Sequence, residues 1–167
     1  PVLWYFNDTK WEHPDTFRFF ADLCSVFHHS VYVDADGRSV EDVCYDEGAL
    51  PNNFMAFCSR ILKAQRLQRF IGDGDILIFG IGPDEQHRAE RIQQVYRDVA
   101  RKRKISITLR FPLIEHPDVS VDRWLADLRI EPPVLYKLGF KHNNCSGGCV
   151  RASKRQWIHL YHTLPDV

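Results

Sequence analysis

The chain has 167 residues, enough for one domain with a real hydrophobic core. Its 22 lysines and arginines balance its 22 aspartates and glutamates, so the overall charge gives no preference for nucleic acid or for a membrane surface. Five cysteines without a secretory signature argue against a disulfide scaffold, and no apolar run approaches the roughly 20 residues that cross a bilayer, so we expect a cytoplasmic protein with reduced thiols and no membrane contact.

Short apolar runs alternate with amphipathic stretches along the chain. Strands are predicted where an apolar run is bounded by polar or glycine residues, at residues 2–6, 31–34, 76–80 and 105–109. Helices are predicted where apolar residues recur at helical spacing, at residues 14–27, 51–71, 85–103, 121–128 and 151–161. This alternation favours a single α/β domain over residues 1–167, with helices on both faces of a parallel sheet in three α/β/α layers.

Some segments and side chains receive more specific predictions. Residues 38–48 are acidic and are expected to form a partly ordered connection. Cys24 shares the apolar stripe of the 14–27 helix and is therefore expected in the core. Phe54 and Trp124 are also predicted to face inward.

Two cysteines bracket a Ser-Gly-Gly tripeptide within residues 139–167, which we read as a cysteine-containing loop followed by the C-terminal helix. Cys149 is predicted to lie where that helix begins, and a helix N-terminus lowers the pKa of a thiol. Glycines permit a tight turn that would bring Cys145 and Cys149 toward one point. Cys58 opens a separate amphipathic run. The prediction is that these three thiols converge on one metal or iron–sulfur site; the alternative is that they are ordinary buried thiols.

The remaining ligand for such a site is less defined. His142 lies close enough in sequence to Cys145 to serve as a fourth ligand, although a single loop histidine is also compatible with an exposed position. Cys44 has no neighbouring Gly, His or Cys and is a weak ligand candidate.

Polar residues follow two of the predicted strands. In parallel α/β folds, ligands bind beyond the carboxyl ends of the strands. Asp8 and Thr9 follow the first strand, and Gly80, Glu85 and Arg88 follow the third, so these are the predicted pocket residues. The alternative for the second loop is a proline-initiated helix with a weak surface ion pair between Glu85 and Arg88.

Four motifs in chain order resemble the phosphoadenosine-phosphosulfate (PAPS) reductase-like branch of the adenine nucleotide alpha-hydrolase superfamily. The family's second-strand motif of Asp-Thr-Gly followed by Glu-x-Pro resembles residues 6–14, and its Cys-Thr-Arg-x-x-Lys helix resembles residues 57–63. Its Gly-Ile-Arg-x-Asp-Glu-x-x-Arg loop resembles residues 80–88, although Gly82 stands where relatives often carry arginine. Leu138-Gly139-Phe140 and the following residues to Val150 resemble its closing motif.

The resemblance implies a nucleotide-type sheet and sulfur-related chemistry on an adenylated or phosphosulfate nucleotide. Relatives grip ATP with an N-terminal PP-loop, Ser-Gly-Gly-x-Asp-Ser, which has no equivalent here, since Ser146-Gly147-Gly148 follows no apolar strand. An N-terminally truncated fold is therefore predicted, with the PP-loop supplied by a partner chain, a second copy or a missing segment. The cysteines imply a [4Fe-4S] cluster, with zinc as the alternative ion.

Three functions follow from these features. The first is an enzyme, or the larger part of one, of the ATP pyrophosphatase type acting in sulfur transfer. The second is a non-catalytic binding or partner module that kept the fold and the metal site. The third is a nucleic-acid-binding accessory that uses the basic residues at the end of the 85–103 helix, Arg97, Arg101, Lys102, Arg103 and Lys104.

Overall fold

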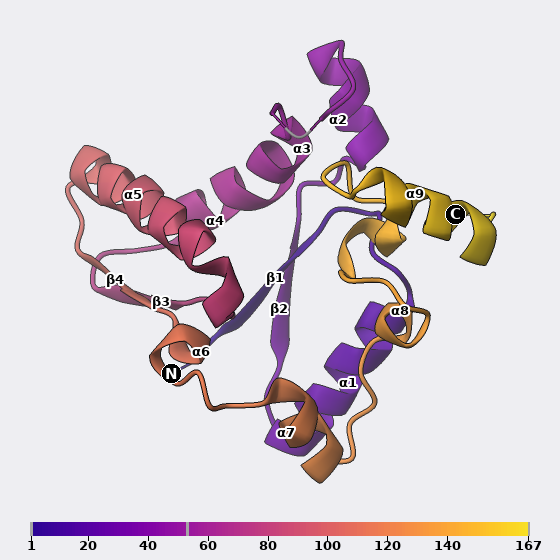
Figure 1. Cartoon of the computed structure of the whole chain (residues 1–167). Coiled ribbons are helices and arrows are strands. Elements are labelled where there is room, and N and C mark those ends of the chain that lie inside the picture. Colours follow the sequence, from indigo (N-terminus) through magenta and orange to yellow (C-terminus); the bar gives the residue numbers. More distant parts are fainter. Residues whose placement is uncertain (1, 53, 167) are drawn as a thin grey trace. The chain divides into compact units, whose positions relative to one another are not determined.

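The computed structural model describes residues 2–52 and 54–166 (Figure 1). Two compact units result, one from the chain up to Arg66 together with Trp124 onward, the other from Leu67–Arg123. The first unit contains β1 (Trp4–Asp8), α1 (Asp15–Phe27), β2 (Val31–Ala35), α2 (Val40–Glu47), α3 (Phe57–Ser59), the π-helical turn η1 (Arg60–Ala64), α8 (Val134–Lys137), the 3₁₀ turn η3 (Asn144–Gly147) and α9 (Lys154–Thr163). The second contains β3 (Asp75–Ile78), the 3₁₀ turn η2 (Pro83–Glu85), α5 (Gln86–Arg103), β4 (Ile107–Arg110) and α6 (Pro112–Glu115). In sequence, α4 (Gln65–Phe70) and α7 (Val121–Asp127) connect the two units.

Each unit is built on one pair of parallel strands. In the first unit, β1 and β2 are in register from Trp4 opposite Val31 to the ends of both strands. In the second, β3 and β4 are in register from Asp75 opposite Ile107. Parallel strands joined by helices define an α/β fold, so the predicted fold class is confirmed, with its strands paired two and two.

Helix α1 covers one face of the β1–β2 pair. The Phe6 ring meets Phe17 and Phe20 edge-on, with ring centroids 6.4 and 4.6 Å apart. Trp4 meets Phe27 in the same way at 5.6 Å. Aromatic pairs in this geometry add about 0.5–1.5 kcal/mol beyond the area they bury. The helical spacing of the α1 aromatics, visible in the sequence, therefore places the helix on the sheet.

The opposite face of β1 and β2 is polar. The Tyr5 hydroxyl donates to the Asp34 carboxylate at 2.6 Å, and Arg66 donates to the same carboxylate through two nitrogens, its Nε at 2.6 Å. These Arg66 bonds lower the pKa of Asp34, whereas burial raises the pKa of Tyr5 to about 12. Both faces of a parallel sheet are usually apolar. On this face of β1 and β2, the ion pair between Asp34 and Arg66 stands where apolar packing is usual.

Residues 38–48 form a regular helix instead of the predicted connection. Asp42 donates its backbone N–H to the Ser39 hydroxyl at 3.1 Å, and the Asp42 carboxylate accepts the Ser39 N–H at 2.8 Å, which is a capping box. Val40 and Val43 are buried, and Gly48 ends the helix in a left-handed conformation. The acidic composition suggested a solvated connection, but the cap and the two valines define α2.

The predicted 51–71 helix begins later than expected. Helical structure starts at α3 and continues through η1 and α4 to Phe70; Asn53 lies outside the described residues. Phe54 is 98% exposed and Trp124 is 57% exposed, so the prediction that both face the core is wrong. Phe57 is buried with Leu62, as expected for the helical face that begins there.

The last helix also begins later than predicted. Ser153 is its N-cap, because the Ser153 hydroxyl accepts the backbone N–H of Gln156 at 3.2 Å and α9 starts at Lys154. Cys149 therefore precedes the helix by several residues. The prediction that this thiol lies at a helix N-terminus is wrong, and its electrostatic environment has another source.

The second unit has its own small core. Ile81, Ala89 and Phe111 are buried together, and the Phe79 ring stacks on Phe111 with centroids 5.8 Å apart. Through these contacts α5 packs beside β4. Among the described residues, no helix is both long enough and apolar enough to cross a bilayer.

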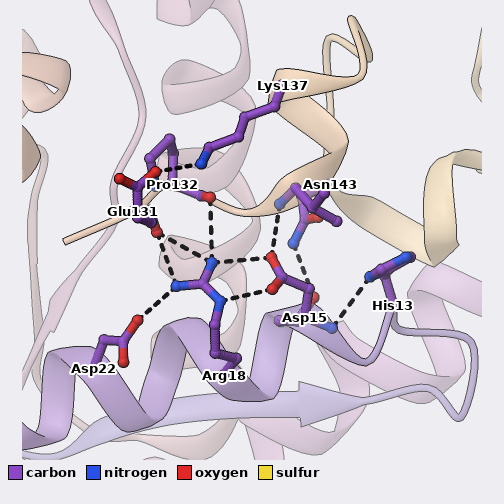
Figure 2. A network of polar contacts seen from close by, with 10 residues as sticks. His13, Asp15, Arg18, Asp22, Glu131, Pro132, Lys137 and Asn143 are labelled. Carbon is purple, nitrogen blue, oxygen red and sulfur yellow. Dashed lines mark hydrogen bonds and ion pairs between the residues drawn. The ribbon is translucent and has the colours of Figure 1, made fainter.

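An arginine network fastens α1 to the segment that leads into α8 (Figure 2). The Arg18 guanidinium donates to the carboxylates of Asp15, at 2.6 and 3.0 Å, and Asp22, at 2.5 Å. It also donates to the backbone carbonyls of Glu131 at 3.1 Å and Pro132 at 3.2 Å. A charged, forked donor that satisfies acceptors from two segments holds them in one geometry.

This network predicts a pH-dependent contribution to stability. Hydrogen bonding to Arg18 lowers the pKa of Asp15 from 3.8 to about 2. Because the folded-state pKa is the lower one, the stabilisation is present above about pH 4 and is lost as the pH falls toward 2. Asp15→Asn should lower the free energy of unfolding by about 1–2 kcal/mol at pH 7, measured by urea denaturation, and by less at pH 3.

A matched control is Asp98→Asn, which removes the exposed i,i+3 ion pair between Asp98 and Arg101 in α5. Such surface pairs contribute little, so this change should alter stability by less than about 0.5 kcal/mol. Equal losses in both variants, or an Asp15→Asn loss that does not shrink at pH 3, would contradict the assigned role of Arg18.

Candidate functional site

The cysteine loop, which we define as residues 143–149, turns through an uncommon backbone conformation. Cys145 has φ 50° and ψ 48°, Ser146 has φ 49° and ψ 30°, and Gly147 has φ 86°. The left-handed region costs a non-glycine residue roughly 1–2 kcal/mol. The Gly148 N–H donates to the Cys145 carbonyl at 2.8 Å and closes the turn. The turn returns the chain toward Cys145, so that Cys149 comes back to the first sulfur.

Gly147 is the tightest point of the loop. A Cβ atom there would lie 2.7 Å from Cε1 of Phe140, whose ring is itself buried. The Gln156 amide of α9 is also buried and donates to the Gly147 carbonyl at 3.0 Å. Only a residue without a side chain fits at this position while keeping a positive φ.

Two hydrogen bonds tether the loop to the chain that follows β1. The Ser146 hydroxyl donates to the backbone carbonyl of Trp11 at 3.0 Å. The Asn143 side-chain amide donates to the hydroxyl of Thr16, a buried residue in the first turn of α1, at 2.9 Å (Figure 2). Segments more than 120 positions apart in sequence are thus held together beside the end of β1.

The two sulfurs of the cysteine loop interact directly. The Cys145 thiol donates a hydrogen bond to the Cys149 sulfur, which lowers the pKa of Cys149 and raises that of Cys145. The backbone N–H of Arg151 and the positive charges of Lys63 and Arg151 also lower the pKa of Cys149, against the opposing effect of burial. Negative charge in the pair is therefore stabilised on Cys149, by local donors and cations and not by a helix N-terminus.

Cys58, the third predicted thiol, lies within electrostatic reach of this pair. It is only 9% exposed, and burial is the main reason that its pKa is raised. Charge on Cys149 contributes to the same shift, and so does charge on Cys44. The convergence of Cys58 with Cys145 and Cys149 on one site stays a prediction.

A buried carboxylate acts electrostatically on Cys145. The Glu12 side chain is 3% exposed; its Oε1 accepts a hydrogen bond from the Thr9 hydroxyl at 3.0 Å and lies 3.4 Å from the Lys63 ammonium. Lys63 is supplied by η1 and acts electrostatically on both Cys145 and Cys149. A buried ion pair of this kind fixes the position of the ammonium group.

The donor set was tested for fit to the predicted metal or cluster. His142 is exposed, and none of its interactions in the described structure joins it to the sulfurs. Within residues 2–52 and 54–166, no group of three or more His, Cys, Asp or Glu side chains is arranged to hold a metal ion. The described side chains therefore do not form a metal cage.

Asp8 and Thr9, the predicted nucleotide-binding residues of the first unit, end β1 and begin the following loop. Asp8 accepts the backbone N–H of Lys10 at 2.8 Å and pairs with its ammonium at 3.2 Å. Thr9 is 1% exposed, and its hydroxyl is used by Glu12. Their predicted contact with a nucleotide remains a prediction, with Asp8 the more accessible of the two.

Gly80, Glu85 and Arg88 belong to the second unit. They follow β3 across η2 into the start of α5, as the strand–loop–helix prediction required. Arg88 donates to Glu85 at 2.9 Å across one helical turn, and both side chains are partly exposed. This is the surface ion pair that the alternative interpretation described. Binding of a nucleotide by Gly80, Glu85 and Arg88 stays a prediction.

Comparison with known proteins identifies the family. A family model described as the phosphoadenosine phosphosulfate reductase domain matches residues 1–154. The chain therefore belongs to this family, and the resemblance drawn from the four motifs is confirmed. No curated protein and no solved structure matches the chain. Family membership implies binding related to adenine nucleotides and a function related to sulfur-bearing nucleotides.

Two residues of the site were missed as functional candidates. Glu12 and Lys63 stand inside motifs that were used for the family resemblance, but neither was assigned a role. The signal was available, because Lys63 closes the Cys-x-x-x-x-Lys spacing from Cys58 and Glu12 lies three residues after Thr9. What the sequence lacked was any indication that the two side chains meet.

The tight position of Gly147 predicts a strong effect of a single methyl group. Gly147→Ala should destabilise the protein by about 2–4 kcal/mol in urea denaturation, because it adds a steric conflict with Phe140 to the cost of a positive φ. Gly37→Ala is the control, since Gly37 also has positive φ but open space around it, and it should cost about 1 kcal/mol. Similar losses in the two variants would show that Phe140 moves away freely.

Proposed function

We propose that this PAPS reductase family protein handles the sulfur of an adenylated or phosphosulfate nucleotide at the Cys145–Cys149 pair. The observation that carries the proposal is the positive charge of Lys63, which the buried Glu12 carboxylate holds in position and which acts electrostatically on both sulfurs. The family assignment supports the nucleotide and sulfur classes of the substrate.

Cys149 is the nucleophile in this proposal. Its sulfur receives hydrogen bonds from the Cys145 thiol and from the Arg151 N–H, which favour the thiolate, the reactive form of a cysteine. Attack on the sulfate sulfur of a phosphosulfate nucleotide would form a sulfur–sulfur bond. The bond from that sulfur to the phosphate oxygen would break, and the nucleotide phosphate would leave with the electron pair.

Lys63 supplies the positive charge for this step. Its side chain is about one-third exposed (32%), so it can meet an anionic sulfate or phosphate while still paired with Glu12. Charge that develops on oxygen during the transfer is stabilised by a cation already held in place. The Thr9 hydroxyl, bonded to the same carboxylate, restricts Glu12 and through it Lys63.

Asp8 and Thr9 of the first unit are proposed to contact a nucleotide, and Gly80, Glu85 and Arg88 of the second unit are each proposed as nucleotide-binding residues as well. The PP-loop would come from another chain or from a second copy. The polar loops after β1 and β3 support this assignment, since such loops bind ligands in α/β folds. A nucleic-acid partner for the basic end of α5 is a separate proposal and rests on sequence charge alone.

The proposal predicts that Lys63 contributes to binding of a phosphosulfate nucleotide. Lys63→Met should weaken that binding about tenfold in isothermal titration calorimetry, because a charge-assisted contact is lost. Arg60→Met is the matched control from the same turn, since Arg60 is exposed and pairs only loosely with Glu47 at 3.5 Å; its affinity should stay within about twofold of the wild type.

Lys63→Met also leaves the Glu12 charge without its partner, so the double variant Lys63→Met/Glu12→Gln should be titrated beside it. Weak binding by both variants supports the role of Lys63. Unchanged affinity in the double variant contradicts it. If the wild type, alone and with any co-purifying chain, gives no heat with ATP or a phosphosulfate nucleotide, the non-catalytic binding module replaces the enzyme as the better proposal.

The predicted [4Fe-4S] cluster, or zinc, held by Cys58, Cys145 and Cys149 with His142, stays a proposal of its own. The electrostatic coupling of Cys58 to Cys149 supports it, because three thiols from two segments would supply most of the ligands. A [4Fe-4S] cluster bound by three protein thiolates would leave one iron without a protein ligand, free to bind a sulfur atom. A zinc ion would instead stabilise the fold of the cysteine loop.

This second proposal is tested by metal content. Protein purified without oxygen should contain stoichiometric iron and absorb broadly near about 400 nm, or contain zinc if that is the ion. Cys145→Ser should lose the metal, and Cys24→Ser, which alters a thiol in α1, should retain it. Equal loss in the two variants would mean that the ligands are misassigned, and a metal-free wild type would end the proposal.

A further inference from the structure

Cys145 and Cys149 lie at the two ends of one closed turn, because the Gly148 N–H donates to the Cys145 carbonyl at 2.8 Å and Cys149 follows directly. The turn brings the chain back toward Cys145, and the opposite pKa shifts of the two thiols agree with this approach. Both residues are half-buried, so a small reagent can reach them.

We propose that Cys145 and Cys149 form a reversible intramolecular disulfide, which makes the cysteine loop a two-electron dithiol couple. The oxidant is a low-molecular-weight disulfide such as oxidised glutathione. One loop sulfur attacks this disulfide, forms a mixed disulfide and releases a first glutathione thiol. The second loop sulfur attacks the mixed disulfide and releases a second glutathione thiol, so that two protein thiols are oxidised and one glutathione disulfide is reduced.

The loop is held in the shape that this exchange needs. Left-handed backbone from Cys145 to Gly147 reverses the chain, and the Gly148 N–H bond to the Cys145 carbonyl fixes the turn. Ser146 is anchored to the Trp11 carbonyl, and the Gly147 carbonyl is anchored by α9. Sulfurs that are already in contact on an anchored turn meet with little loss of freedom.

Cys58 is the competing partner, and its surroundings argue against it. It lies on α3, a different segment, and is 9% exposed, whereas the two loop thiols are more accessible. Its interaction with Cys149 is through charge, while Cys145 is bonded to Cys149 directly. A thiol–disulfide exchange that begins at one thiol of the cysteine loop is therefore expected to end in a Cys145–Cys149 disulfide, and not in a disulfide with Cys58.

The inference goes beyond the proposed function and does not require it, since it needs two thiols and a disulfide reagent but no nucleotide. In the proposed sulfur chemistry, the same pair would supply two electrons from within the chain. A metal on these thiols would have to leave before the disulfide forms, so oxidation is measured on the protein as purified and again after treatment with a chelator.

Peptide mapping tests the pairing without ambiguity. Trypsin releases residues 142–151 with both loop cysteines on one peptide, residues 39–60 with Cys44 and Cys58, and residues 19–38 with Cys24. The protein is equilibrated in buffers of graded reduced-to-oxidised glutathione ratio, quenched with acid, alkylated and digested. We expect peptide 142–151 to lose both alkyl groups together and to become about 2 Da lighter than the dithiol, reversibly with the glutathione ratio.

Four outcomes would overturn the inference. The first is a cross-link between peptides 142–151 and 39–60, which would make Cys58 the partner. The second is full alkylation of both loop thiols across all ratios, with and without chelator. The third is a Cys145–Cys149 disulfide that forms only in urea. Cys58→Ser should keep the internal disulfide, and Cys149→Ser should leave Cys145 alkylated or glutathionylated; loss of the disulfide in Cys58→Ser, at native circular dichroism, would also overturn it.

Discussion

The buried Glu12 carboxylate is the interaction on which the rest of the site depends. An ionised carboxylate that is almost fully withdrawn from water is costly unless it is paired and hydrogen-bonded. Glu12 meets both conditions, with the Lys63 ammonium on one side and the Thr9 hydroxyl on the other. The pairing joins the loop after β1 to η1, and it fixes a cation beside the sulfurs. It adds to the packing of Trp11 against the core cluster that contains Leu62 and to the bond from Ser146 to the Trp11 carbonyl.

The charge of Lys63 has two uses at once. It compensates Glu12, and it favours negative charge on the neighbouring thiols. A cation bound only to Glu12 would be neutralised, whereas one that remains about one-third exposed (32%) still acts on an approaching anion. Lys63 must pair with Glu12 and also stay accessible to an anion, and the π-helical form of η1 is consistent with this double requirement. Such turns shift side chains relative to a regular helix and are frequent at functional sites.

Sequence patterns predicted what depends on local order. The strands, α1 and α5 follow from apolar periodicity. Patterns failed where a local cap outweighed composition, as at Ser39 for α2 and Ser153 for α9. Phe54 shows a different error: its apolar side chain was predicted to lie in the core, but it is exposed to solvent.

The side-chain meetings across long sequence separations could not be predicted in this way. Glu12 and Lys63 are 51 positions apart, and Asp34 and Arg66 are 32 apart. Each is an ordinary charged residue on its own segment, and only the folded chain pairs them. Periodicity carries no information about which acid meets which base, so a site built from such pairs appears in the sequence as unrelated charges.

The backbone of the cysteine loop indicates which of its side chains are used. Glycine would relieve the left-handed conformation at positions 145 and 146, as it does at 147, yet Cys145 and Ser146 occupy them. Ser146 offsets part of this cost through its bond to the Trp11 carbonyl. Cys145 has its interaction with the Cys149 thiol as its compensation, which raises the pKa of Cys145. A residue kept at a strained position for its side chain is a residue whose chemistry matters, and here that chemistry is the meeting of two sulfurs.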